Sequence, residues 1–133
     1  LYSGVGSFGL ECISRGAREV TFVENDSSAL DVLKKNIDNL SVHKNTKIIQ
    51  NKVENINNEF LEKKYDIIFL DPPYADNKFI KNLIFLQKNK IREKNHIVII
   101  HREKNRKDNL DKIFNLIFEK SYGRSKVLFG TLL

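Results

Sequence analysis

The fold of this chain is constrained most by one short stretch, residues 67–74, which reads IIFLDPPY. Its first half is an apolar run with the length and branching of a buried parallel strand. That strand cannot continue through Pro72 and Pro73, because proline has no N–H to donate to a neighbouring strand. We therefore expect Asp71 at the carboxyl end of the strand, and in open α/β sheets ligands bind at that edge.

The residues Asp71, Pro72, Pro73 and Tyr74 have a specific chemistry. Each proline favours an extended conformation in the residue before it, which fixes the Pro72 carbonyl beside the Asp71 carboxylate. Two neighbouring acceptors suit a group with two N–H donors, such as an amide or the exocyclic amine of a base, and Tyr74 offers a flat face to the ring. Holding both N–H groups out of the ring plane would favour attack by the nitrogen lone pair. The alternative interpretation is a Pro-Pro turn that follows a strand and has an Asp by chance.

A second motif lies at the start of the sequence. Residues 1–16 read LYSGVGSFGLECISRG and match G-x-G-x-x-G at Gly4, Gly6 and Gly9. Such glycines permit a tight turn, close approach of a ligand to the backbone and close packing of the following helix. The motif is weak by itself and needs a strand before it, but the sequence begins at Leu1. We expect the first strand, which lies at the middle of such a sheet, to be largely missing and the chain to be a piece of a longer protein.

An acidic residue ends the next expected strand, over residues 19–24. Glu24 lies 15 residues after Gly9. A carboxylate at the end of the second strand can accept both hydroxyls of a ribose. This position strengthens the glycine motif, and the alternative is an exposed acid at a strand end.

The rest of the chain alternates between helical and strand patterns. Helices are expected over 27–40, capped by Asp26 or Ser27, over 53–62 and over 76–88, and strands over 46–50, 65–70 and 96–101. Residues 110–121 have mixed periodicity, which we interpret as a short helix passing into a strand near 115–121, before a last antiparallel strand at 127–129. This order predicts one α/β domain over residues 1–133, with a mostly parallel sheet, a C-terminal antiparallel hairpin and helices on both faces.

Charge and composition limit the kinds of partner. The net charge is +6, and residues 1–77 contain 9 Lys/Arg and 12 Asp/Glu, whereas residues 78–133 contain 14 and 5. The asymmetry indicates either a polyanionic partner of the second half or a surface solvated by scattered lysines. One cysteine and three isolated histidines argue against disulfides and a metal site, with His43 and His96 expected at the surface and Cys12 and His101 in structural roles. No stretch is long and apolar enough to span a membrane, and a cytoplasmic protein is the expectation.

The cofactor and the family follow from combining the motifs. The glycine motif and Glu24 would suit NAD as well as S-adenosylmethionine, but hydride transfer has no use for the two fixed acceptors and stacking ring of residues 71–74. With these residues the chain resembles the Rossmann-like S-adenosylmethionine-dependent amino-methyltransferases. It resembles most closely the RsmD family, bacterial enzymes that methylate guanine N2 in small-subunit (16S) ribosomal RNA. The resemblance extends over essentially the whole chain and is carried by residues 1–17, 23–24, 69–74 and 122–129.

The resemblance implies S-adenosylmethionine as cofactor, ribosomal RNA or an assembling 30S particle as partner, and a monomer without metal. The cofactor would be bound by Gly4, Gly6, Gly9, Glu24, Asn25, Val53 and Asp71. Catalysis would fall to Asp71, Pro72, Pro73 and Tyr74, with an exposed or flipped guanine stacked on Tyr74 while Asp71 and the Pro72 carbonyl take its N2 hydrogens. Phosphate contacts are expected from cations that border the site: Arg15, Lys78, Lys81, Arg102, Lys104 and Arg106.

The sequence departs from the family pattern in places that concern the cofactor and the RNA. An Asp of the family's first strand and an N-terminal region that helps to grip RNA have no counterpart. Asn51-Lys52-Val53 stands where many relatives have an acid that supports the adenine. The adenine would then be held by the Val53 backbone and an apolar wall, and the cofactor site of this chain would be incomplete.

Three other functions remain open. A DNA adenine-N6 methyltransferase shares the Asp-Pro-Pro-Tyr motif but usually needs an added target-recognition domain. A nicotinamide-dependent oxidoreductase explains the glycine motif and Glu24 but not residues 71–74. A non-catalytic RNA-binding relic fits the basic second half.

Overall fold

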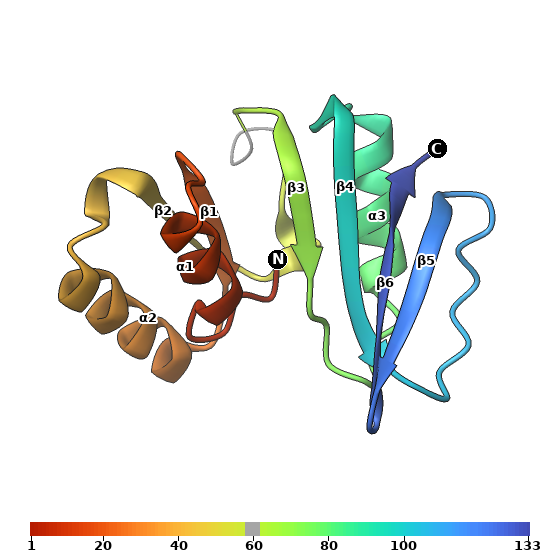
Figure 1. Ribbon diagram of the computed structural model, residues 1–133, viewed down its shortest axis with the longest axis horizontal. Coiled ribbons are helices and arrows are strands. Elements are labelled where there is room, and N and C mark those ends of the chain that lie inside the picture. The colour runs from red at the N-terminus through yellow and green to blue at the C-terminus, as the bar shows by residue number, and fades with distance from the viewer. Residues whose placement is uncertain (58–61) are drawn as a thin grey trace. The chain divides into compact units, whose positions relative to one another are not determined.

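The computed structural model describes residues 1–57 and 62–133, which form two compact units, Leu1–Asn55 and Ile56–Leu133 (Figure 1). The described strands of the first unit form a two-stranded sheet, and those of the second form a four-stranded sheet. Of the helix expected over 53–62, residues 53–55 form only the short 3-10 helix η2 (Val53–Asn55), residues 56, 57 and 62 are not helical, and residues 58–61 lie outside the described chain. The single domain over residues 1–133 stays a prediction.

The first unit contains the parallel strands β1 (Val20–Glu24) and β2 (Thr46–Gln50). Helix α1 (Ser7–Ser14) precedes β1, and helix α2 (Ser27–Leu40) connects the two strands, followed by a short 3-10 helix, η1 (His43–Asn45). A helical crossover between neighbouring parallel strands is the connection that an α/β fold requires. The predicted bounds of β1, α2 and β2 are met to within one residue.

Local chemistry explains how α2 forms and where it packs. It begins at Asp26, whose carboxylate accepts a hydrogen bond from the Ala29 N–H at 2.8 Å, as an N-cap residue does. Along α2, Leu30, Leu33 and Ile37 recur every three or four residues, and all three are buried with Phe22 of β1 in one hydrophobic cluster. This packing fixes the position of β1 and hence of the Glu24 side chain at its end.

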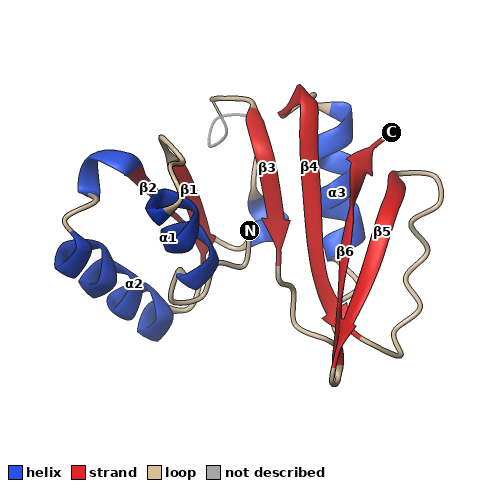
Figure 2. Ribbon diagram, in the orientation of Figure 1, coloured by secondary structure: helices blue, strands red, loops and turns tan. Residues whose placement is uncertain are grey.

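The second unit is a four-stranded sheet in the order β3–β4–β6–β5, with its strands drawn in red in Figure 2. Strands β3 (Tyr65–Leu70) and β4 (Arg92–Glu103) are parallel and are connected through helix α3 (Phe79–Lys88). Strand β6 (Ser125–Leu132) is antiparallel to β4 and to the edge strand β5 (Phe114–Tyr122). The predicted C-terminal hairpin is therefore confirmed.

The segment before β5 differs from the prediction. In this described stretch a single turn replaces the expected short helix: the Leu110 carbonyl accepts the N–H groups of Ile113 and Phe114, both at 2.9 Å, and β5 starts at once. The side chains of these three residues are all buried. One turn that buries three apolar side chains produces the same spacing as a helix, which is why the periodicity was misleading.

Strand β4 is 12 residues long and extends well beyond the predicted range 96–101. His96, expected at the surface, is only 5% exposed, so that expectation is wrong. Its Nδ1 lies 2.9 Å from the Glu93 carbonyl, and its Nε2 accepts the Leu132 N–H at 2.9 Å. The inward face of β4 thus contains two polar residues, His96 and Arg102, alternating with apolar ones.

Candidate active site

The glycine motif forms the turn from which α1 starts. Gly4 and Gly6 have φ angles of 55° and 88°, in the left-handed region that favours glycine. A Cβ on Gly6 would lie 2.3 Å from Leu33 Cδ1, so this glycine permits close packing. A Cβ on Gly4 would meet no atom within 4 Å. Gly4 therefore borders open space, as backbone approach to a ligand requires.

Glu24 is bonded to this turn. Its Oε2 accepts the Gly4 N–H at 2.6 Å, and its Oε1 accepts the N–H groups of Asn25 and Asp26, both at 3.1 Å. An ionised carboxylate has about four acceptor positions, so these three donors leave little of it unused. The expected contact with both hydroxyls of a ribose would therefore require the hydroxyls to replace one or more of the backbone donors.

Ser3 places an unsatisfied polar group in the same turn. Its N–H donates to the Val23 carbonyl at 3.0 Å, and its carbonyl accepts the Gly6 N–H at 2.9 Å. Its hydroxyl is buried and has no hydrogen-bond partner within the described residues. Such a group is uncommon in proteins and marks a place where a ligand or a water completes the hydrogen bonding.

The end of β2 lies against the end of β1. The Asn51 N–H donates to the Glu24 carbonyl at 3.0 Å, and Val53 follows as a buried residue, 6% exposed. The residues expected to bind the two ends of an adenosine thus follow neighbouring strands at one edge of the small sheet. Every expected cofactor residue except Asp71 belongs to the first unit.

Asp71 and His101 meet at the carboxyl ends of β3 and β4. Because Leu70 lies opposite Ile100 in this parallel pair, the residues that follow them are also neighbours. His101 Nδ1 is 2.7 Å from Asp71 Oδ1, and since the carboxylate accepts, Nδ1 is assigned the hydrogen. The other oxygen, Oδ2, has no partner within the described residues, and the Asp71 side chain is 46% exposed. His101 was expected only in a structural role, and the parallel pairing of the two strands is the signal that points to this contact.

Tyr74 stands beside this pair. The Pro73 carbonyl accepts the Asp76 N–H at 2.8 Å, which closes a turn with Tyr74 as its second residue. The Tyr74 side chain is exposed, and its ring centre lies 6.1 Å from that of His101 at an interplanar angle of 59°. A stacking surface and an acceptor oxygen therefore lie close together, as a planar ring with an amino group would require.

Pro72 differs from its neighbours in the motif because it is buried, whereas Asp71, Pro73 and Tyr74 are exposed. No hydrogen bond within the described residues reaches its carbonyl. The Pro72 carbonyl therefore has no hydrogen-bond donor within the described residues, but it is covered by other atoms. An amine could reach it only if the atoms that cover it moved.

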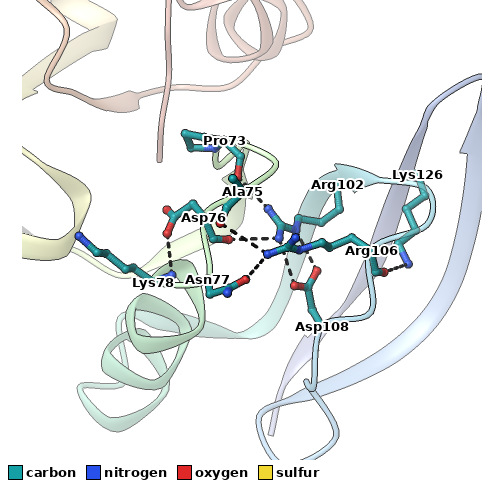
Figure 3. A network of polar contacts seen from close by, with 9 residues as sticks. All are labelled: Pro73, Ala75, Asp76, Asn77, Lys78, Arg102, Arg106, Asp108 and Lys126. Atoms are coloured by element: carbon teal, nitrogen blue, oxygen red, sulfur yellow. Dashed lines mark hydrogen bonds and ion pairs between the residues drawn. The ribbon is translucent and has the colours of Figure 1, made fainter.

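The loop over residues 71–76 is held in place by Arg102 of β4 (Figure 3). Its Nη1 donates to the Pro73 carbonyl and its Nη2 to the Asp76 carbonyl, both at 3.1 Å. A guanidinium has five N–H donors in a rigid plane, so it can bond two carbonyls and a carboxylate at once. Arg102 therefore fixes the backbone on both sides of Tyr74.

The rest of the guanidinium is also satisfied. Nε and Nη2 contact the two carboxylate oxygens of Asp108 at 2.8 and 3.1 Å, and Cζ lies 4.4 Å from the centre of the Phe79 ring. Arg102 is 0% exposed. The expectation that Arg102 contacts RNA phosphates is therefore corrected: a fully buried cation with all its partners inside the protein is not available to them. Its place in the buried alternation of β4 was the overlooked signal.

The other expected phosphate contacts have varied surroundings. Arg15 is on α1 of the first unit and forms an exposed ion pair with Glu11 at 2.8 Å. Arg106 Nη2 donates to Asn77 Oδ1 at 2.6 Å, beside the 71–76 loop (Figure 3). Lys78 is exposed just before α3. Contacts of these three residues with RNA stay predictions.

Other kinds of site have little basis in the residues that the structure describes. Burial and the neighbouring Glu11 carboxylate raise the pKa of the Cys12 thiol, which disfavours the thiolate that nucleophilic chemistry needs. No group of three or more potential metal ligands is present in the described part of the chain. In that same part, no helix has the length and apolar character needed to cross a membrane.

Comparison with known proteins decides the family. A family model described as Conserved hypothetical protein 95 matches residues 1–131. This chain belongs to that family. Relatives of this chain carry the name Ribosomal RNA small subunit methyltransferase D, which confirms the resemblance to the RsmD family.

Two of these relatives show how much is shared. The Buchnera aphidicola protein is 36% identical over 103 residues, which cover 77% of this chain and 53% of the relative. The Haemophilus influenzae protein is 30% identical over 124 residues, which cover 92% of this chain and 64% of the relative. The chain therefore spans about half to just under two thirds of the length of these curated relatives.

Solved structures of other proteins have the same fold as this chain. A crystal structure from Haemophilus influenzae, described provisionally as a methylase, has a TM-score of 0.81 at 28% identity and covers 99% of this chain and 84% of its own. A conserved hypothetical protein from Streptococcus pyogenes has a TM-score of 0.84 at 22% identity, with 97% and 81% covered. The predicted α/β Rossmann-like methyltransferase fold is confirmed.

Proposed function

We propose that this chain carries an S-adenosylmethionine-dependent methyltransferase activity on small-subunit ribosomal RNA, with the exocyclic N2 amine of a guanine as the acceptor. The carrying observation is the geometry at Asp71. One carboxylate oxygen is fixed by His101, whose ring centre lies 6.1 Å from that of the exposed Tyr74, and the other oxygen has no partner within the described residues. The relatives' names support ribosomal RNA as the substrate class.

The first unit supplies the groups that suit the cofactor. Gly4 borders open space, Ser3 offers a buried hydroxyl without a partner among the described residues, and Glu24 places a carboxylate at the same turn. These features fit a polar, ribose-containing ligand, with Gly6, Gly9, Asn25 and Val53 completing the proposed binding segments. When bound, S-adenosylmethionine supplies an electrophilic methyl group.

The residues of the second unit act on the base. Tyr74 stacks against the guanine, and Asp71 Oδ2 accepts one N2 hydrogen, while Arg102 keeps the loop in the conformation that makes both contacts possible. The cofactor would supply the methyl group that N2 takes up, and Asp71 or water would accept the proton that N2 loses. The second N2 hydrogen would form a hydrogen bond with the Pro72 carbonyl once the atoms that cover this carbonyl have moved.

An adenine N6 amine on DNA would meet the same acceptor and the same ring, so the site does not separate the two bases by itself. The names of the relatives favour ribosomal RNA. A nicotinamide-dependent reaction gives no role to the fixed Asp71 and the exposed Tyr74. Neither alternative is favoured by a specific observation.

The test compares Asp71→Asn with Asp66→Asn, a matched control at an exposed position of β3. We expect Asp71→Asn to lower kcat for methyl transfer from labelled S-adenosylmethionine to ribosomal RNA by about 100-fold or more, because a positioned side chain that accepts a proton contributes about 10²–10⁴-fold. Calorimetry should show cofactor affinity within a few-fold of the unaltered chain. Undiminished transfer by Asp71→Asn would exclude the assigned role of the carboxylate.

A further inference from the structure

A groove of about 470 Å³ lies on the second unit, beside the candidate active site. It is lined by Tyr74, Glu103, Lys104, Asn105, Gly123 and Arg124. These residues come from the Asp-Pro-Pro-Tyr loop, the end of β4 and the turn between β5 and β6. Its volume is within the range of sites that bind small molecules, about 300–1,000 Å³.

The walls of the groove are set by the backbone. The Lys104 N–H donates to the Arg124 carbonyl at 2.8 Å, and Glu103 pairs with Ser125 in the β4–β6 register. Gly123, with a φ of 54°, makes the tight turn that brings Arg124 into place. The backbone contacts between the end of β4 and the β5–β6 turn thus bring the lining residues together.

Two cations of the groove have no protein partner in the described part of the chain. Lys104 and Arg124 are exposed, and within the described residues neither side chain forms a hydrogen bond or an ion pair. Nearby cations are occupied: Arg102 by Asp108 and the loop, Arg106 by Asn77, and Lys126 by the Arg106 carbonyl at 2.8 Å. Lys104 and Arg124 are thus the groove's unused positive charges.

An aromatic ring and polar acceptors complete the lining. Tyr74 belongs both to this groove and to the candidate active site, where its ring neighbours that of His101. The Glu103 carboxylate and the Asn105 amide can bond the N–H and carbonyl groups of a base edge. Exposed cations that hold phosphates, combined with a stacking ring, are what single-stranded RNA binding uses.

We propose that this groove binds the nucleotide adjacent to the target base in single-stranded RNA, with Lys104 and Arg124 on its phosphates. The assignment rests on the proposed function, because Tyr74 connects the groove to the acceptor carboxylate. It goes further by naming the residues that recognise the flanking backbone. The groove then fixes the register of the strand, so that the target base arrives at Asp71.

The test compares the double variant Lys104→Ala/Arg124→Ala with Lys88→Ala/Lys112→Ala, which removes the same charge from exposed residues outside the groove. The probe is a short labelled single-stranded RNA with one guanine, titrated without methyl donor so that binding is measured apart from catalysis. We expect the groove variant to weaken binding at least tenfold more than the control. The plot of log K against log salt should become less steep, by about 0.7 for each phosphate that the variant no longer neutralises.

A second probe identifies the phosphate that the groove binds. A neutral methylphosphonate linkage next to the guanine should weaken binding to the unaltered chain and have little further effect on the groove variant. Equal affinities and equal salt slopes for the groove and control variants would overturn the proposal. Failure of the unaltered chain to methylate any RNA, with the groove effect intact, would instead count against the proposed function alone.

Discussion

At the scale of single residues, the acidic residues Glu24 and Asp71 are each held by a partner that lies far away in the sequence. The glycine spacing and Glu24 indicate a site for one ligand, and in the structure the Gly4 N–H donates to Glu24 Oε2 at 2.6 Å. The chemistry of Asp71 was visible in the sequence, but its hydrogen bond to His101 depends on strand register across 30 positions. Arg102 is expected at the surface because a charged residue is usually exposed, whereas Asp108, Phe79 and two loop carbonyls account for its burial.

His101 should act as a positioning residue for Asp71. His101→Phe removes the Nδ1 donor but keeps a ring beside Tyr74, and we expect kcat to fall about 10- to 100-fold, because a hydrogen bond to a charged group contributes about 1.5–3 kcal/mol. His101→Asn keeps a donor near the Nδ1 position and should recover much of the activity. Steady-state kinetics should show unchanged KM for the cofactor. Equal decreases in the two variants would argue for a packing role instead.

His96 should make the stability of the protein depend on pH. Burial lowers the pKa of its imidazole from the ordinary value of about 6.5, and the Leu132 N–H donates to Nε2, so the folded protein favours the neutral ring. The unfolded chain therefore binds more protons just below pH 6.5, and the stability present above that pH is lost as pH falls toward the lower folded pKa. Thermal unfolding between pH 8 and 5 should show this decline. His96→Gln, which can still accept from Leu132, should flatten it, and an unchanged profile would contradict this origin.

At the scale of elements, periodicity located the helices and strands, and local hydrogen bonding decided their ends. Asp26 was one of two N-cap residues predicted from the sequence, and its carboxylate caps α2, which starts at Ser27 as predicted. Helix α3 starts at Phe79, three residues later than expected, because the Asp76 carboxylate and carbonyl are used by the Lys78 N–H and by Arg102. Contacts from another strand cannot be read from a local pattern, so such boundaries move.

The Arg102 contact between β4 and the 71–76 loop should matter for both stability and catalysis. Arg102→Met leaves the buried Asp108 carboxylate unpaired, and removing one partner of a buried ion pair costs about 3–5 kcal/mol. Adding Asp108→Asn removes the stranded charge and should restore part of the free energy of unfolding, measured with urea. The loop carbonyls still lack their donor, so kcat should stay low in both variants. Recovery of kcat together with stability would show that Arg102 acts through stability alone.

At the scale of the whole molecule, the alternation of helices and strands was enough to predict an α/β fold with a closing hairpin. The pairing of strands was less accessible, because hydrogen bonds between distant strands leave no local signature: the described strands form two sheets, β1–β2 and β3–β4–β6–β5. The distribution of charge follows directly from the sequence. Residues 1–55 contain seven Lys/Arg and seven Asp/Glu, whereas residues 56–133 contain 16 and 10, so the whole net charge of +6 belongs to the second unit.

This division of charge makes different predictions for the two ligands. RNA affinity should decrease between 50 and 200 mM salt, with log K falling by about 0.7 per phosphate neutralised for each unit of log salt. Affinity for the cofactor, which is placed mainly in the first unit with its net charge of zero, should change little. Neutralising Lys78 and Lys81 with glutamine should lower the RNA slope. The same change at Lys34 and Lys35, exposed on α2 of the first unit, should leave it unaltered. Equal slopes for both pairs would mean that the excess of lysine in the second unit only solvates its surface, and the polyanion interpretation of the charge asymmetry would have to be abandoned.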